Sequence, residues 1–269
     1  MSDADLQLAL RCARELAATA QLFVASDFRR AERHTKADGS DVTETDLRIE
    51  RLIAERVHRV FPDHALLAEE AVNQPANMPA PAEARYCWIA DPLDGTRNYA
   101  RDLPCCVTAI ALLDRGVPVV AVTRDLFAGT EYRAVRGGGA HSGDRVLRVA
   151  DRLFDRHSLV TFQPAEDGST YDEATWLRRV HVRNFGTTAL HLALVAEGCV
   201  DGAVCFQNRL WDIAGGTLLI EEAGGVITQP DGSPIAPFDL TTDPRGDRSF
   251  IAGSAAVHPL LVAGMKRPA

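Results

Sequence analysis

Acidic residues recur in this chain where apolar segments give way to turns. Trp88–Asn98 reads WIADPLDGTRN, an apolar run that ends in two aspartates three residues apart, Asp91 and Asp94. Asp-Pro and Asp-Gly are common in turns, so this stretch alone is also compatible with a surface turn. The other acids of this kind, each beside a turn or an expected helix start, are Asp46, Glu69 and Asp212.

Carboxylates that a fold brings together repel one another. Two like charges about 4 Å apart cost roughly 4 kcal/mol at an effective dielectric constant of 20. Protons or cations must therefore neutralise such a cluster. Oxygen donors without histidine or cysteine suit Mg²⁺ or Mn²⁺ and not zinc, so these acids predict such an ion if the fold gathers them.

The composition of the chain excludes several classes of protein. Its 269 residues suit one large domain or two closely packed halves. The net charge of −8 disfavours a nucleic-acid partner, because phosphate backbones require a basic face. No apolar run reaches the roughly 18 residues of a membrane span, and the acidic N-terminus is unlike a signal peptide, so we expect a cytoplasmic protein without a membrane partner. The six cysteines lack C-x-x-C spacing, which favours buried apolar roles for them.

The hydrophobic pattern predicts helices and strands that alternate in blocks. This alternation indicates a mixed α/β fold in which helices cover layered sheets. Helices are expected over 3–24, from near Thr43 to Pro62, over 187–198 and over 211–225; strands over 86–90, 105–113, 117–125, 130–135, 157–163, 201–206 and 249–254; a glycine-rich turn over 136–145; and an exposed, mobile loop over 73–84.

Four motifs occur in one order along the chain: DVTETD (41–46), AEE (68–70), WIADPLDGT (88–96) and WDIAGGTLLIEEAGG (211–225). Together they resemble the signature of the inositol monophosphatase family of metal-dependent, lithium-sensitive phosphatases, from about residue 5 to 255. The resemblance implies an αβαβα layered sandwich and a single phosphatase domain over 1–269. Its N-terminal half, about 1–150, would supply most metal ligands, and its C-terminal half, about 151–269, the substrate pocket and Asp212.

The resemblance also implies which residues hold the metal ions. Glu69, Asp91 and the Leu93 carbonyl would bind the first Mg²⁺, and Asp91 would bridge to a second ion held by Asp94 and Asp212. A weaker third ion would depend on Glu69, and Mn²⁺ could replace Mg²⁺. Two divalent ions can activate a water, stabilise a leaving alkoxide and cancel the charge of the phosphate.

By the same resemblance, Asp46 and Thr96 position and deprotonate the attacking water. Backbone N–H groups of Gly95 and Thr96, at a helix start, would hold a phosphate oxygen close to the chain. Lys36 is a further candidate, as a mobile cation near the site.

Each assignment has a purely structural alternative. Thr43 and Asp46 also form the pattern of a capping box, and Asp212 could cap the helix that follows Trp211. Glu69 and Glu70 could be a solvated pair, and Glu70 is expected outside the ligand set. His191, in an apolar helix, is expected to be a core histidine.

The sequence defines the substrate less closely than it defines the metal ligands. Gly186, Thr187 and Thr188 resemble the segment that lines the family's pocket for the alcohol, where Asp94 and Asp212 would also contact substrate. Inositol-specific relatives have a carboxylate seven residues before the Trp-Asp aspartate, and this chain has Cys205 there, with Gln207 and Asn208 nearby as alternative polar contacts.

We therefore expect Mg²⁺-dependent hydrolysis of a sugar or polyol phosphate, with inositol 1-phosphate as the first named candidate. Histidinol phosphate, fructose 1,6-bisphosphate, adenosine 3′,5′-bisphosphate and nucleotide phosphates are alternatives, as is a non-catalytic relative that binds a phosphate-bearing ligand. A homodimer is expected from the family alone.

Overall fold

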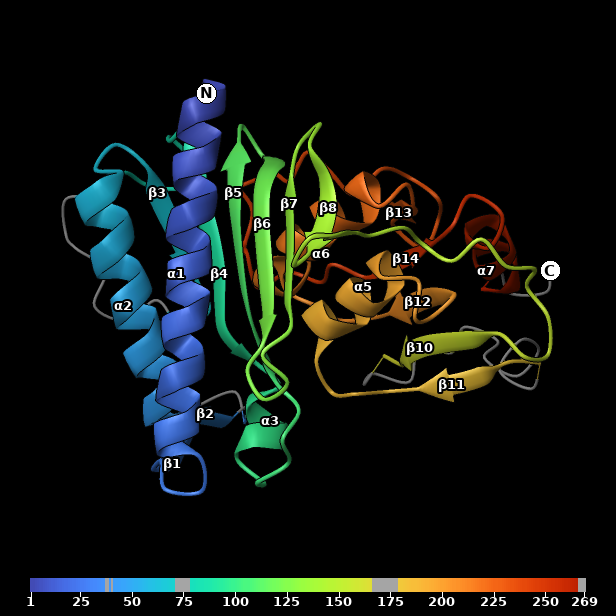
Figure 1. Ribbon diagram of the computed structural model, residues 1–269, viewed down its shortest axis with the longest axis horizontal. Coiled ribbons are helices and arrows are strands. Elements are labelled where there is room, and N and C mark those ends of the chain that lie inside the picture. Colours follow the sequence, from blue (N-terminus) through green and yellow to red (C-terminus); the bar gives the residue numbers. More distant parts are fainter. Residues whose placement is uncertain (37–38, 40, 71–77, 166–178, 266–269) are drawn as a thin grey trace.

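Two β-sheets alternate with three layers of helices across the molecule (Figure 1). The computed structural model describes residues 1–36, 39, 41–70, 78–165 and 179–265. One pair of helices packs on the outer face of the larger sheet, a second pair lies between the sheets, and a C-terminal helix packs on the smaller sheet. The expected αβαβα sandwich is confirmed. The helices are α1 (Asp3–Asp27), α2 (Glu44–Val60), α3 (Thr96–Tyr99), α5 (Thr188–Ala196), α6 (Leu210–Glu222) and α7 (His258–Gly264).

The larger sheet has seven strands in the order β3-β4-β5-β6-β7-β8-β9, and the smaller has five in the order β11-β10-β12-β14-β13. Strands β1 (Arg33–Thr35) and β2 (Asp41–Thr43) form a separate antiparallel pair. The larger sheet comprises β3 (Ala65–Ala68), β4 (Tyr86–Asp94), β5 (Val107–Asp114), β6 (Val117–Asp125), β7 (Glu131–Val135), β8 (Gly139–Ser142) and β9 (Arg145–Val146). The smaller comprises β10 (Leu159–Gln163), β11 (His181–Arg183), β12 (Gly202–Cys205), β13 (Val226–Thr228) and β14 (Phe250–Gly253).

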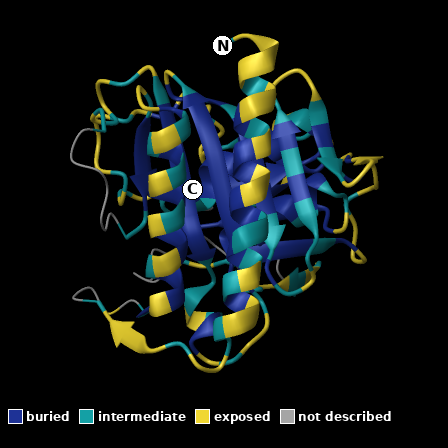
Figure 2. Cartoon of the chain, turned by 60° about the vertical axis from the view of Figure 1, so that its left-hand side comes forward, coloured by how far each residue is buried: buried dark blue, intermediate teal, exposed yellow. Residues whose placement is uncertain are grey.

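The two outer helices follow from their apolar stripes. Ile49, Ile53 and Val57 recur at helical spacing in α2 and are fully buried against the sheet. The helix begins after Thr43 and ends at Val60, close to the expected bounds. Figure 2 shows the exposed residues of the outer helices on their solvent side, with the buried strands behind them.

Strand β4 runs through the middle of the molecule and into the DPLDGT motif. Its side chains alternate between two cores: Trp88 packs with α1 and α2, whereas Ile89 packs with α6. We expected a strand that stops before Asp91. Instead, β4 continues to Asp94, with a shift of register against β5 between Asp91 and Asp94. Such irregularities redirect side chains, and here both aspartates reach one pocket.

The other differences from the expected elements concern short segments. The glycine-rich stretch expected as a turn contains β8 and β9 as well as turns. Of the expected exposed loop over 73–84, residues 73–77 lie outside the described residues. Strands β11 and β13 and helix α7 were not anticipated, because each is short and has little periodicity. In the part of the chain that is described, no helix has the length and apolar character needed to cross a membrane.

Candidate functional site

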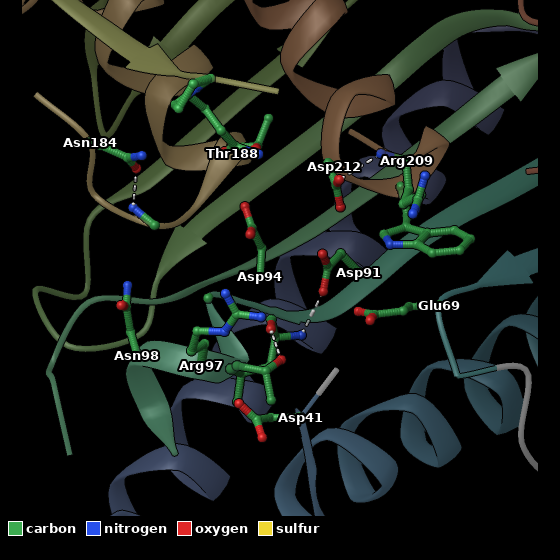
Figure 3. Close-up of a pocket in the computed structure, with 17 residues that line it drawn as sticks. Asp41, Glu69, Asp91, Asp94, Arg97, Asn98, Asn184, Thr188, Arg209 and Asp212 are labelled. Atoms are coloured by element: carbon green, nitrogen blue, oxygen red, sulfur yellow. Dashed lines mark hydrogen bonds between the residues drawn. The ribbon is translucent and has the colours of Figure 1, made fainter. Parts of the chain in front are cut away.

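Four of the five expected acids line a pocket of about 450 Å³, beside the end of β4 and the first turns of α3, α5 and α6 (Figure 3), whereas Asp46 lies behind it. Both halves of the chain contribute to its wall. The residues that line it are Asp41, Glu69, Asp91, Leu93, Asp94, Gly95, Thr96, Arg97, Asn98, Gln163, Pro164, Asn184, Gly186, Thr188, Arg209, Trp211 and Asp212.

Five carboxylates line this pocket, and the four that were expected there, Glu69, Asp91, Asp94 and Asp212, come from three separate segments, with Asp41 as an addition (Figure 3). Burial, followed by the negative charges of Glu69, Asp94 and Asp212, raises the pKa of Asp91 well above its usual range. Burial and the charge of Asp94 likewise raise the pKa of Asp212. Because several ionised carboxyls in one buried place repel one another, the cluster favours a proton or a cation near these oxygens.

Backbone and hydroxyl donors orient three of the carboxylates. Asp91 Oδ1 accepts from the Leu93 N–H at 2.9 Å, within the irregular end of β4. Asp212 Oδ2 accepts from the Arg209 N–H at 2.7 Å; α6 begins at Leu210, so Asp212 is its third residue and reaches back to the N-cap Arg209, whereas the structural alternative had Asp212 itself as the cap. Asp94 Oδ2 accepts from Thr187 Oγ1 at 2.7 Å and from the Ala189 N–H at 2.6 Å, yet burial still raises the pKa of Asp94 to about 7.

Asp46 caps its helix with one oxygen and contacts Thr96 with the other. Its Oδ2 accepts from the Thr43 N–H at 2.9 Å and closes the capping box of α2. Its Oδ1 accepts from Thr96 Oγ1 at 2.9 Å, and the same hydroxyl lies 2.8 Å from the Leu93 carbonyl oxygen. Asp46 is almost completely buried, and this burial raises its pKa to about 6 against the opposing hydrogen bonds from Thr43 and Thr96. A carboxylate with that pKa can accept a proton near neutral pH.

Lys36 reaches the acidic cluster. Its Nζ lies 3.0 Å from Glu69 Oε1 and 2.5 Å from Glu70 Oε1. Burial lowers the pKa of Lys36, but the charges of Glu69 and Glu70 outweigh it, so the net pKa is raised. Burial and the charge of Glu69 raise the pKa of Glu70 to about 7, and the Glu70 N–H donates to Glu50.

The structure places most of the expected substrate contacts at the pocket, with one exception. Gly186, Thr188 and Gly95 line it, and Thr187 is joined to it through Asp94. Cys205 does not line it. Its side chain is fully buried at the end of β12, a strand paired on both edges, where Sγ lies 3.5 Å from Nδ1 of His191.

Sequence analysis missed several polar residues of the pocket wall. Arg97 and Asn98 directly follow the DPLDGT motif, and Gln163 ends an expected strand. These positions in the sequence could have indicated that the three side chains lie near the pocket. Asn184 and Arg209 lie in loops without a motif of their own.

The donor set of the pocket fits a hard divalent ion. Glu69, Asp91, Asp94 and Asp212 offer only carboxylate oxygens, and Leu93 is also among the lining residues. Within the described ranges, no three His, Cys, Asp or Glu side chains already converge closely enough to hold a metal ion.

The comparisons with known proteins agree with this chemistry. An inositol-1-monophosphatase from Synechocystis sp. is 35% identical over 250 residues, which cover 90% of this chain and 84% of that relative. A protein named Nus factor SuhB from Xylella fastidiosa is 33% identical over 224 residues, 80% of this chain and 78% of that one. The crystal structure of extragenic suppressor protein suhB from Bartonella henselae matches with a TM-score of 0.85 at 26% identity, over 97% of this chain and 100% of that chain. The sequence model of the inositol monophosphatase family matches residues 5–265, and the chain belongs to that family.

Proposed function

We propose that this family phosphatase hydrolyses a small sugar or polyol phosphate with the help of Mg²⁺, and that inositol 1-phosphate is its first candidate substrate. The observation that supports the proposal is the raised pKa of Asp91, a buried carboxyl surrounded by the charges of Glu69, Asp94 and Asp212. A cluster of this kind binds protons when no cation is present and divalent cations when they are available.

Two or three Mg²⁺ ions, or Mn²⁺ in their place, would be held by Glu69, Asp91, Asp94, Asp212 and the Leu93 carbonyl. When bound, such ions lower the pKa of a bound water and stabilise the charge of the phosphate and the leaving alkoxide. Thr96 and Asp46 supply the proton path: the Thr96 hydroxyl accepts a hydrogen bond from the attacking water and donates to Asp46 Oδ1 at 2.9 Å. The N–H groups of Gly95 and Thr96 would hold a phosphate oxygen.

Uncharged polar groups support a hydroxyl-rich alcohol as the leaving group. Beyond the acidic cluster and two arginines, Arg97 and Arg209, the pocket wall has the amides of Gln163, Asn98 and Asn184 and the hydroxyl of Thr188. Amides and hydroxyls both donate and accept hydrogen bonds, as the hydroxyls of a polyol require. Histidinol phosphate, whose alcohol is cationic, fits this wall less well than a neutral polyol. Fructose 1,6-bisphosphate, adenosine 3′,5′-bisphosphate and nucleotide phosphates remain alternatives, as does non-catalytic binding of a phosphate-bearing ligand.

Phosphate release from a substrate panel tests the proposal. The panel contains inositol 1-phosphate, histidinol phosphate, fructose 1,6-bisphosphate, adenosine 3′,5′-bisphosphate and a nucleoside monophosphate, each with Mg²⁺ and again with EDTA. We expect release that depends on Mg²⁺ and is fastest with inositol 1-phosphate. Release unaffected by EDTA would contradict the metal assignment. No release from any substrate, together with tight Mg²⁺ binding, would support the non-catalytic alternative.

The remaining features of the proposal rest on the family resemblance. We propose one phosphatase domain over 1–269, a homodimer and a cytoplasmic location. A pocket whose wall comes from both halves of the chain supports the single domain. The acidic net charge still predicts no nucleic-acid partner, although several relatives bear the name of a Nus factor or putative Nus factor.

A further inference from the structure

A buried histidine contacts the pocket wall from behind. His191 lies in α5 with no exposed surface and does not line the pocket. Its Nε2 lies 3.0 Å from the backbone nitrogen of Phe185, and its Nδ1 lies 3.5 Å from Cys205 Sγ. Because a backbone N–H can only donate, Nε2 is the unprotonated nitrogen, and the ring proton is on Nδ1, directed at Cys205. Both nitrogens of His191 therefore have partners, as expected for a core histidine.

His191 holds the N–H of Phe185, and a residue from the other half of the chain holds the carbonyl of Phe185, in the next peptide unit. The Phe185 carbonyl accepts from Asn98 Nδ2 at 2.7 Å, and the same amide donates to the Cys105 carbonyl at 2.9 Å. Gly186 follows with φ of +69°, and a Cβ there would lie 3.0 Å from both polar atoms of the Asn98 amide. The turn thus packs closely against Asn98 of α3 and leaves little space for a side chain at position 186.

This turn leads directly to the donors that orient Asp94. Thr187 Oγ1 and the Ala189 N–H both donate to Asp94 Oδ2, at 2.7 and 2.6 Å. Thr187 and Ala189 follow Phe185 by only two and four residues. Because so short a segment has few free torsion angles, we expect a shift of Phe185 to move both donors. The orientation of a proposed metal ligand therefore depends on how the Phe185 peptide is held.

We propose that His191 is a positioning residue, whose Nε2 fixes the Phe185 N–H so that Thr187 and Ala189 hold Asp94 in the orientation that binds the metal ion. This inference rests on the proposed function in its assignment of Asp94 as a ligand. Burial lowers the pKa of His191 to about 4, so Nε2 is available as an acceptor at neutral pH. Cys205, which fails to reach the pocket, lies at the other ring nitrogen, where its Sγ accepts from the Nδ1–H that the Phe185 contact leaves protonated.

Two substitutions separate the hydrogen bond from the packing of the ring. His191→Gln keeps an acceptor near the position of Nε2, whereas His191→Leu fills the space without one. Since a single lost hydrogen bond weakens an equilibrium by roughly tenfold, we expect His191→Leu to raise the Mg²⁺ concentration for half-maximal activity about tenfold and to lower kcat by a similar factor. His191→Gln should restore both to within about threefold.

His258→Leu is the matched control. His258 is also buried, and its Nε2 pairs with Thr228 Oγ1 at 2.9 Å in a region that does not line the pocket. This variant should lower Tm and leave kcat and the Mg²⁺ requirement unchanged. Should His191→Leu not fold, Asn98→Ser in the half-buried α3 releases the carbonyl of the same residue, Phe185; because Asn98 also lines the pocket, the readout for this variant is the Mg²⁺ requirement, which should rise as in His191→Leu.

Deuterium exchange in the metal-free protein provides a readout independent of catalysis. The Phe185 amide should exchange at least about tenfold faster in His191→Leu than in the parent or in His191→Gln, because the acceptor that protects it is gone. A folded His191→Leu with unchanged Phe185 exchange and unchanged Mg²⁺ requirement would overturn the inference. Loss of the same size in His191→Gln and His191→Leu would overturn it as well. If the parent protein released no phosphate, the proposed function would fail, while the exchange and Mg²⁺-binding measurements would still decide the role of His191.

Discussion

Asp94→Asn should stabilise the metal-free protein while it abolishes turnover. The carboxyl of Asp94 has a pKa raised from 3.8 to about 7, which means that its ionised form is disfavoured in the folded state. One pKa unit corresponds to about 1.4 kcal/mol, so the ionised group costs the fold roughly 4 kcal/mol at most. An asparagine has a similar shape, its amide oxygen can accept from Thr187 and Ala189, and it avoids that cost.

The sign of the pH dependence follows from the direction of the shift. Asp94 is ionised in the folded state above pH 7 and protonated well below it, so the cost is fully present above pH 7 and disappears as the pH falls toward 4. We expect Asp94→Asn to gain about 2 to 4 kcal/mol at pH 8 in EDTA, a rise in Tm of roughly 5 to 10 °C for a domain of this size, and less than about 1 kcal/mol at pH 4, close to the unfolded pKa of 3.8.

Thermal unfolding at both pH values, with EDTA and with Mg²⁺, measures these effects. Mg²⁺ should raise the Tm of the parent protein much more than that of Asp94→Asn, and turnover of the variant should fall by roughly a hundredfold or more. Asp231→Asn is the matched control: Asp231 is exposed, hydrogen bonds from Ser233 lower its pKa, and its removal should give no stabilisation. A loss of stability in metal-free Asp94→Asn at pH 8 would show that the hydrogen bonds of the carboxylate outweigh its burial, and would refute the reasoning.

Further outcomes concern the neighbouring residues. Thr96→Val, which removes the hydroxyl between the pocket and Asp46, should lower kcat by roughly 10² to 10⁴, whereas Thr96→Ser should keep most of it; equal rates for the two variants would exclude a proton path through this hydroxyl. Gly95→Ala should destabilise the fold by about 2 kcal/mol in chemical denaturation, since Gly95 has φ of +96° and a Cβ would lie 2.9 Å from the Cys105 carbonyl oxygen. Gly143→Ala, at φ of +57° with open space around it, should lose only about 1 kcal/mol, and similar losses at both positions would mean that the contact has no effect. Cys205→Glu should cause misfolding or a large drop in Tm with no new preference for inositol 1-phosphate, because the carboxylate would be buried against His191; a stable variant with a changed substrate ratio would place this position in the pocket after all. Millimolar Li⁺ should inhibit phosphate release by competing for the less tightly held ion, and an insensitive rate would separate this chain from the lithium-sensitive members of the family.

The residues that sequence analysis located well are those whose role depends on local chemistry. The stripe of Ile49, Ile53 and Val57 predicts α2, and Thr43 with Asp46 predicts its capped start, because both patterns are set within a few turns of chain. Four of the five expected acids also line one pocket, since the motifs that contain them indicate a known fold.

The residues that were misplaced depend on tertiary packing. Counting back from Asp212 led to Cys205, but the register of β12 between β10 and β14 directs this side chain into the core. Two residues in a strand differ only in which face they occupy, and the sequence of a strand buried on both faces does not distinguish them. Gln163 and Asn184 were missed for the same reason, because their position at the pocket follows from how the two sheets pack.

The pocket also has a consequence for how the protein folds. Glu69, in the first half of the chain, and Asp212, near its end, approach one another only when both sheets and the helices between them have assembled. Contacts so distant in sequence form late, so an ion that needs both residues has little to bind in the transition state for folding. Mg²⁺ should therefore leave the refolding rate almost unchanged and slow the unfolding rate. For this chain the ion would stabilise the folded protein against unfolding and would not help it to fold.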